Sequence, residues 1–259
     1  MNVPPLRRQV LVPCDPATAE RLWTDELGAW WPIGSFGCFG EGAHVEFDGD
    51  TIVETSADGE RAIWGTVTSR TSGALSYTWH PGRDASEATS VTVTFTPTGA
   101  EDLTLVTLVH TGWETIEARD DYAGGWIAVL DHFIRGAPAD GQPDVADGVW
   151  FVLEHTAGPA TPDEGVFSSP SFGHHIAFLR WLDDQGVLVA GGPLPDTKGA
   201  GMTVVRATDH ETASTIVTAA QLQDGAVTSG LLDVRVRPWR VALSALPAVP
   251  ATDTEDIHR

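Results

Sequence analysis

Six successive runs of alternating apolar and polar residues between residues 43 and 112 constrain the fold more than any other feature of the sequence. Gly, Asp or Pro separates the runs, and side chains that alternate along an extended strand point to opposite faces of a sheet. Leu75, Tyr77 and Trp79, for example, share one face. The pattern predicts a curved antiparallel meander with strands near AHVEF, DTIVET, RAIWGTVTSR, ALSYTWH, SVTVTFTP and LTLVTLVHTG.

Elements on both sides of these runs complete a first domain. A strand at RRQVLVP comes first, and Asp15 followed by Pro16 is a pairing of N-cap and first helical residue that starts a helix. We expect this helix to end at Gly28. After the strands, apolar residues at three- and four-residue spacings predict a long helix over residues 116–134. Its inner side is expected to carry Tyr122, Trp126, Ile127, Leu130 and Phe133.

A stretch rich in Pro, Gly, Ala and Asp follows, and it lacks the apolar periodicity of a packed element, as is typical of a linker. The sequence beyond it predicts strand, helix, strand, strand, helix and strand, which is the ferredoxin-like order. Thr208 with Glu211 is expected to form a capping box at the start of the second of these helices. The predicted chain is therefore an α+β protein with a first domain at 5–135, a linker at 136–148, a second domain at 149–247 and a flexible tail at 248–259.

Two adjacent histidines lie in the first helix of the second domain. We expect this helix to start at Ser169 and Pro170, which places His174 and His175 in its second turn. The two point about 100° apart, so His174 is expected on the helix surface. A metal pair on a helix needs a spacing of three or four residues, so we reject a zinc site on this helix. His155, near the end of the preceding strand, is too loosely placed to restore one, and we expect no metal.

Composition narrows the function classes. The formal net charge of -21, from 36 acidic and 15 basic residues, repels phosphate backbones and anionic lipid, which argues against nucleic-acid and membrane-surface binding. The sequence shows no apolar signal core and no run of membrane-spanning length. Two cysteines are too few for a disulfide framework. We therefore expect a cytoplasmic protein, and we expect no cofactor.

The first domain resembles a known family. DPATAERLWTDELGAWWP, the WGTVTSR and LSYTWHPG pair, LTLVTLVHTGW and the long helix resemble the START-related, helix-grip (SRPBCC) superfamily, in its branch of homologues of the activator of the heat-shock-protein-90 ATPase. The resemblance implies a C-terminal helix gripped by a curved sheet, with an apolar cavity between them for a hydrophobic, aromatic or polyketide-like molecule. Such side chains also form plain core. The candidate ligand-binding residues are Trp31, Tyr77, Trp79, His110 and Trp126.

The second domain is similar to another family. HIAFLRWLDDQGVLVAGGPL and DGAVTSGLLDVRVRPW resemble the YCII-related family, which implies a dimeric α+β barrel. Carried over position by position, the family's histidine falls on His175, its aspartate on Asp224 and its Gly-Pro on Gly192 and Pro193. The resemblance implies that His175 and Asp224 form an acid/base pair beside a pocket that includes Gly192 and Pro193.

One departure from that pattern concerns the aspartate. The Pro and the aromatic residue that follow it in the family are Gly225 and Ala226 here. A Pro would fix the turn, so we expect Asp224 to be held less firmly and the pocket wall to be smaller and looser. A carboxylate on one ring nitrogen of His175 would still fix its tautomer and raise its basicity.

Two functions follow from these patterns. In the first, the helix-grip domain binds a hydrophobic ligand, and His175 with Asp224 performs proton transfer of the lyase or isomerase type, because no nucleophilic Ser or Cys is placed beside them. In the second, the protein is a non-enzymatic ligand-binding or stress-related accessory protein, and its second domain mainly forms a homodimer. The two differ on whether the His175 and Asp224 side chains meet beside an open pocket.

Overall fold

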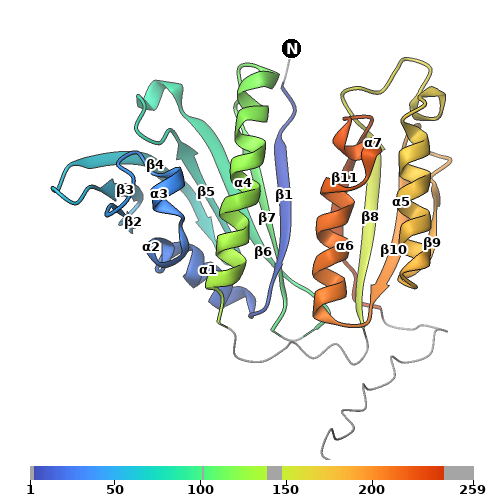
Figure 1. Ribbon diagram of the computed structural model, residues 1–259, viewed down its shortest axis with the longest axis horizontal. Coiled ribbons are helices and arrows are strands. Elements are labelled where there is room, and N and C mark those ends of the chain that lie inside the picture. Colours follow the sequence, from blue (N-terminus) through green and yellow to red (C-terminus); the bar gives the residue numbers. More distant parts are fainter. Residues whose placement is uncertain (1–2, 101, 139–147, 242–259) are drawn as a thin grey trace, which may run out of the picture. The chain divides into compact units, whose positions relative to one another are not determined.

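The chain folds into two compact units. A computed structural model describes residues 3–100, 102–138 and 148–241. Residues 3–97 with 102–138 form the first unit, and residues 98–100 with 148–241 form the second. Each unit has its own antiparallel sheet and its own helices (Figure 1). Most of the expected linker and the whole expected tail lie outside the described residues, so the domain boundaries stay predictions.

The first unit is built on a seven-stranded sheet in the order β1-β7-β6-β5-β4-β3-β2, with every neighbouring pair antiparallel. Strands β2 to β7 follow one another as a meander, which confirms the prediction from the six alternating runs. The register shifts between Ile52 and Val53 and between Val67 and Ser69, and such bulges bend a sheet. The strands are β1 (Leu6–Val12), β2 (His44–Asp48), β3 (Thr51–Thr55), β4 (Arg61–Thr71), β5 (Ala74–Trp79), β6 (Thr89–Pro97) and β7 (Thr104–Thr111).

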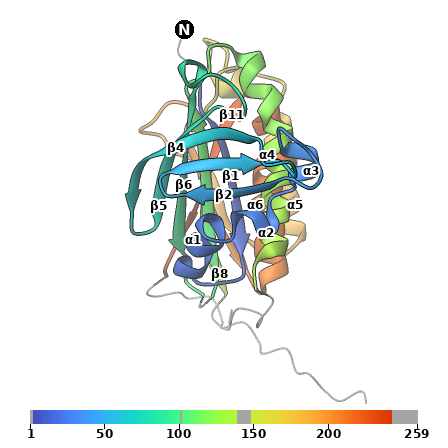
Figure 2. The same cartoon turned by 90° about the vertical axis from the view of Figure 1, so that its left-hand side faces the viewer.

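Helix α4 (Ile116–Gly136) lies against one face of this sheet (Figures 1 and 2). It begins at the N-cap Thr115, whose Oγ1 accepts a hydrogen bond of 3.2 Å from Ala118 N. One residue expected on the inner side, Ile127, is instead 38% exposed, because it is offset from the stripe that the other residues follow. The buried residues of the helix are Trp126, Val129, Leu130 and Phe133.

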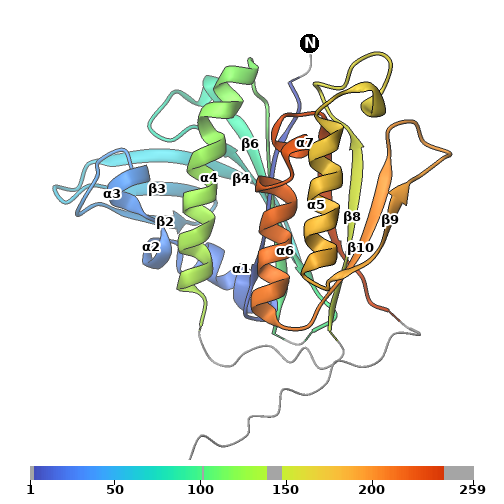
Figure 3. The same ribbon diagram turned by 45° about the vertical axis from the view of Figure 1, so that its right-hand side comes forward.

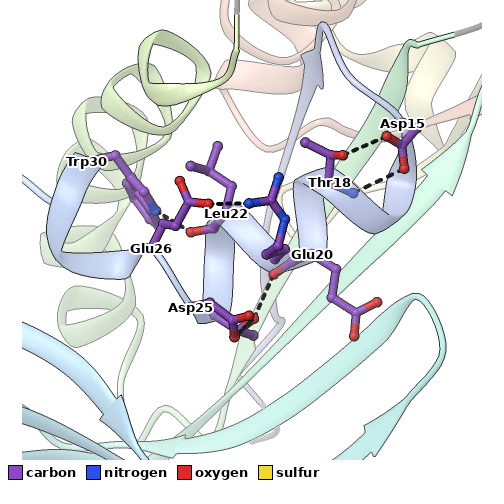
Figure 4. Close-up of polar contacts among 9 residues, drawn as sticks. Asp15, Thr18, Glu20, Leu22, Asp25, Glu26 and Trp30 are labelled. Atoms are coloured by element: carbon purple, nitrogen blue, oxygen red, sulfur yellow. Dashed lines mark hydrogen bonds and ion pairs between the residues drawn. The ribbon is translucent and has the colours of Figure 1, made fainter.

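The first helix begins where the sequence predicts. In α1 (Pro16–Thr24), Oδ1 of the N-cap Asp15 accepts hydrogen bonds from Ala17 N and Thr18 N, and Oδ2 accepts one of 2.6 Å from Thr18 Oγ1 (Figure 4). The predicted end at Gly28 is wrong, because the chain leaves α1 after Thr24 and forms a separate turn, α2 (Leu27–Trp30). A third short helix is α3 (Ile33–Phe36).

Gly28 has a packing role instead. A Cβ atom at this position would lie 2.2 Å from His44 Cε1, so only glycine lets α2 approach β2.

The second unit has a four-stranded antiparallel sheet in the order β11-β8-β10-β9. Helices α5 and α6 lie on one face of it (Figure 3). Its strands and the two longer helices match the predicted sequence of elements, and the short α7 was not expected. The elements are β8 (Val149–Ala157), α5 (Phe172–Asp184), β9 (Leu188–Pro193), β10 (Gly201–Ala207), α6 (His210–Leu222), α7 (Gly225–Thr228) and β11 (Leu232–Pro238).

The first helix of the second unit begins two residues later than predicted, and the second begins at His210 with a different cap from the one predicted. Helix α5 begins at Phe172 after a short 3-10 turn, and the Oγ of Ser169 accepts a hydrogen bond from Ser171 N outside the helix. In α6 the N-cap is Asp209 and not Thr208: its Oδ1 accepts a hydrogen bond of 2.7 Å from Thr212 N. Asp is as good an N-cap as Thr, so pattern matching alone could not choose between neighbouring candidates.

No helix within the described ranges combines the length and the apolar character that a membrane span requires.

Candidate functional sites

The five candidate ligand-binding residues of the first unit lie together. The ring of Trp79 is centred 5.8 Å from that of Trp31, 5.9 Å from that of Tyr77 and 5.4 Å from that of Trp126. His110 is centred 5.9 Å from Trp126. All five side chains are buried. We call them the aromatic cluster; they come from β5, β7, α4 and the end of α2.

Trp79 is the member of the cluster with an unused polar group. The Nε1–H of Trp126 donates to His110 Nδ1 at 3.0 Å, and that of Trp31 donates to the carbonyl of Phe36 at 3.2 Å. The Nε1–H of Trp79 is buried and meets no hydrogen-bond partner among the residues that the structure describes. A buried indole N–H usually finds an acceptor, so this unpartnered donor distinguishes Trp79 from Trp31 and Trp126.

His110 joins α4 to the sheet through a directed chain of hydrogen bonds. Its Nδ1 accepts from Trp126, so its Nε2 carries the proton and donates to Thr89 Oγ1 at 2.6 Å. Thr89 Oγ1 in turn donates to the carbonyl of Trp79 at 2.9 Å. Burial, with a smaller repulsion from Arg83, lowers the pKa of His110 from 6.5 to about 3. His110 is therefore a neutral structural group rather than an acid or base at physiological pH.

A buried carboxylate beside the cluster escaped the sequence analysis. Glu54 is fully buried and accepts hydrogen bonds from Cys38 N at 2.6 Å, Phe39 N at 2.9 Å and Trp64 Nε1 at 2.9 Å. Its signal was present, because Glu54 alternates with the apolar Ile52 in the same run. Three N–H donors compensate for its burial, and they fix the chain after α3 to β3 and β4.

In the second unit, His175 and Asp224 meet. The Nδ1 of His175 lies 2.6 Å from Oδ2 of Asp224, and their side chains are 9% and 0% exposed. Asp224 is also the N-cap of α7, where its Oδ1 accepts a hydrogen bond of 2.9 Å from Ala226 N. The expectation that Asp224 is loosely held is therefore wrong: its two oxygens have separate partners, and α7 replaces a Pro turn.

The glycine at position 225 has a steric explanation. A Cβ atom there would lie 2.8 Å from the Cβ of His174, so a larger residue would push α7 away from α5. Gly225 thus allows close packing between α7 and α5, and the looser pocket wall stays a prediction. His174 is otherwise exposed, as its helical position predicts.

Gly192 and Pro193 lie on the exposed edge strand β9. Pro193 is opposite Gly201 on β10, which is opposite His155 on β8. Two strand spacings, about 10 Å, therefore separate Pro193 from His155. The structure places Gly192 and Pro193 at the rim of the region rather than beside the carboxylate.

His155 is the residue that the sequence analysis set aside and the structure brings into the site. It is 2% exposed, and its ring is centred 4.6 Å from that of His175. Neither of its ring nitrogens has a hydrogen-bond partner within the described part of the chain. Burial first, and then repulsion from His175, lowers its pKa to about 4; Asp224 and the nearby backbone of Leu153 act weakly in the opposite direction.

These three residues form a group that we call the His/His/Asp cluster. One donor atom from each of His155, His175 and Asp224 lies within 4.8 Å of the other two, so the cluster could hold a metal ion. The spacing argument that excluded zinc considered one helix, whereas these side chains come from β8, α5 and the start of α7. The signal for His155 was the inward alternation of Phe151, Leu153 and His155 along β8.

Comparison with solved structures gives matches that each cover about half of this chain. Protein MLL2253 from Mesorhizobium loti is 17% identical and covers 51% of this chain and 96% of its own, with a TM-score of 0.40. The Aha1 dimer from Colwellia psychrerythraea is 16% identical and covers 53% of this chain and 99% of its own, with a TM-score of 0.41. CalU16 from Micromonospora echinospora is 17% identical and covers 52% of this chain and 77% of its own, with a TM-score of 0.37.

No curated protein matches the chain. Among protein families, the model described as Activator of Hsp90 ATPase homolog 1-like protein matches residues 17–135. This range begins in α1 and ends in the last turn of α4, so it spans the meander and the helix that covers it. Residues 17–135 therefore form a domain of the AHSA1-like, helix-grip family, which confirms the resemblance of the first unit.

Proposed function

We propose that the first unit binds a hydrophobic small molecule of aromatic or polyketide-like type at the aromatic cluster. The match of residues 17–135 to the AHSA1-like family supports a ligand-binding role. The observation that carries the proposal is the buried, unpartnered Nε1–H of Trp79 in the middle of the aromatic cluster. An apolar site with one oriented donor selects a ligand that is mostly hydrophobic and carries one carbonyl or hydroxyl oxygen.

Native mass spectrometry of the protein purified without denaturation tests this proposal. We expect a co-purifying molecule, and quenching of tryptophan fluorescence when a panel of aromatic ketones and phenols is added. Trp79→Phe keeps the ring but removes the donor, so it should weaken binding of the oxygen-bearing ligands by about 10-fold. Trp181→Phe, in the second unit, is the control that should leave binding unchanged. A protein that carries no ligand and binds none of the panel contradicts the proposal.

For the second unit we propose a ferredoxin-like, YCII-related domain that performs proton transfer. The element order βαββαβ and the sheet order β11-β8-β10-β9 support the fold assignment. The hydrogen bond of 2.6 Å between His175 Nδ1 and Asp224 Oδ2 supports the chemistry.

His175 and Asp224 have different roles in the proposed proton transfer. Asp224 accepts a hydrogen bond from the Nδ1–H of His175, which fixes the tautomer and leaves the lone pair of His175 on Nε2. A base of this kind can remove a proton beside a carbonyl or an aromatic ring and return it elsewhere, or let a leaving group depart. Isomerisation and elimination are therefore the proposed reaction classes.

Solvent-deuterium exchange tests proton transfer without knowledge of the substrate. NMR of a panel of chlorinated and carbonyl-bearing aromatic compounds in D₂O should show exchange at one carbon with the wild-type protein. His175→Gln should reduce the rate to background, and Asp224→Asn should reduce it by about 10²-fold or more. His174→Ala, on the adjacent residue, should not change it. Equal rates in all four proteins would exclude the pair as the base.

The alternative is a non-enzymatic accessory protein whose second unit mainly forms a homodimer. Large apolar side chains exposed on this unit favour self-association: Phe167 is 62% exposed, Met202 40% and Trp239 44%. A dimer in light scattering that Met202→Glu dissociates, together with no deuterium exchange, would support this alternative. We also propose a cytoplasmic location, which the free thiols of Cys14 and Cys38 support.

A further inference from the structure

The His/His/Asp cluster contains a polar group that proton transfer by His175 and Asp224 leaves unexplained. His155 is more than nine-tenths buried, and both of its ring nitrogens lack partners within the described ranges. Leaving such groups unsatisfied in a protein interior is unfavourable, because they lose the hydrogen bonds that water would give them. A buried imidazole that the chain does not satisfy calls for an occupant from outside the chain.

The occupant must suit two imidazole rings that lie beside one carboxylate. His155 offers ring nitrogens that are buried and meet no hydrogen-bond partner among the residues that the structure describes. The Nδ1 of His175 is engaged by Asp224, which directs the remaining lone pair of His175 onto Nε2. An arrangement in which a carboxylate orients a histidine through its second nitrogen is the usual outer shell of a protein metal site.

We propose that the His/His/Asp cluster binds one divalent transition-metal ion, with His155 and His175 as ligands and Asp224 as the carboxylate that orients His175. Imidazole nitrogens select zinc, copper, nickel or iron over magnesium or calcium. One possible ligand atom from each of the three residues lies within 4.8 Å of the other two, so the three side chains surround one point. Water or a substrate oxygen completes the coordination.

The inference rests on the same His175–Asp224 geometry as the proposed proton transfer but changes its chemistry. With the ion bound, Nε2 of His175 is occupied, and a water on the ion becomes the group that gives up or takes a proton, because metal binding lowers the pKa of water. Ion binding is measured directly and independently of proton transfer. A protein that binds no ion could still catalyse proton transfer, and a protein that binds the ion could lack that activity.

The test is titration of the metal-free, untagged full-length protein with zinc, followed calorimetrically at pH 7.5, and with cobalt, followed by visible absorption. We expect one bound ion per chain. The cobalt-loaded protein should show absorption bands at about 500–700 nm, as is typical of a roughly tetrahedral site with nitrogen ligands. His155→Ala and His175→Ala should each remove this binding. Asp224→Asn should weaken it by about 10- to 100-fold.

The control variant is His174→Ala, because His174 is exposed, adjacent in sequence and outside the cluster. It should bind zinc and cobalt as the wild type does. His155→Gln, which keeps a polar side chain of similar reach, guards against an unfolded His155→Ala protein, and circular dichroism verifies the fold of both. The inference is overturned if the wild type binds no ion, or if folded His155→Gln binds it as tightly as the wild type.

Discussion

His110 shows how a single residue can set the pH response of a domain. Its Nδ1 accepts from the Trp126 N–H, so protonation would bring two donors face to face in a buried position. This geometry agrees with a pKa lowered to about 3. The unfolded chain takes up the proton near pH 6.5, whereas the folded chain does not.

The first prediction concerns the stability of the first unit in mild acid. Because the unfolded state binds the extra proton, the contribution of His110 is present above about pH 6.5 and is lost as the pH falls towards 3. Between pH 7 and pH 5 this loss amounts to about 2 kcal/mol. Urea unfolding followed by tryptophan fluorescence at both pH values measures it. His110→Asn cannot titrate and should show a pH dependence smaller by that amount; an unchanged dependence would refute this role.

The second prediction concerns Gly225. Gly225→Ala places a Cβ 2.8 Å from the Cβ of His174, so α5 and α7 must separate, and we expect a loss of about 1–3 kcal/mol in the free energy of unfolding. Gly173 lies in α5, next to His174, and a Cβ atom there would meet nothing within 4 Å. Gly173→Ala should therefore stabilise the protein by up to about 1 kcal/mol. Denaturant unfolding of both variants provides the measurement, and losses of equal size would remove the steric explanation.

Among the elements, those with long periodic patterns were predictable and those set by tertiary contacts were not. The strands and α4 follow from alternation and from helical spacing, which are local properties of the sequence. The break between α1 and α2 has no such local signal in the sequence, and α7 begins at the cap that Asp224 forms. The site divides in the same way: a resemblance supplied His175 and Asp224, whereas only the pairing of β8 with its neighbours and the position of α5 bring His155 to them.

The third prediction distinguishes two candidate caps of α6. Asp209→Ala removes the acceptor of the Thr212 N–H and should reduce the free energy of unfolding by about 1 kcal/mol. Thr208→Ala should have a much smaller effect, because the Thr208 hydroxyl only donates to Asp209 Oδ2 at 3.2 Å. Chemical denaturation of the two variants side by side decides between them. A larger loss in Thr208→Ala would favour the capping box that the sequence suggests.

At the scale of the whole molecule, the net charge of -21 acts on both units. Like charges repel more in the compact state than in the unfolded chain, and salt screens that repulsion. The fourth prediction is that raising sodium chloride from about 10 mM to about 500 mM raises the melting temperature by about 2–4 °C, as expected for a gain of about 1 kcal/mol. Differential scanning fluorimetry measures it. Tetramethylammonium chloride should act similarly, whereas a rise with sodium alone would indicate specific ion binding.

The buried Glu54 also has a consequence for the chemical reactivity of the protein. Cys38 is exposed, yet partial burial of its thiol and then the nearby Glu54 carboxylate raise the pKa of Cys38 from 9.0 to about 11. The reactive thiolate is thereby about 100-fold scarcer than in an ordinary exposed cysteine, so oxidants and alkylating reagents should modify Cys38 slowly. Partial burial of the thiol, together with a carboxylate that solvent does not reach, thus favours the protonated and less reactive form of Cys38.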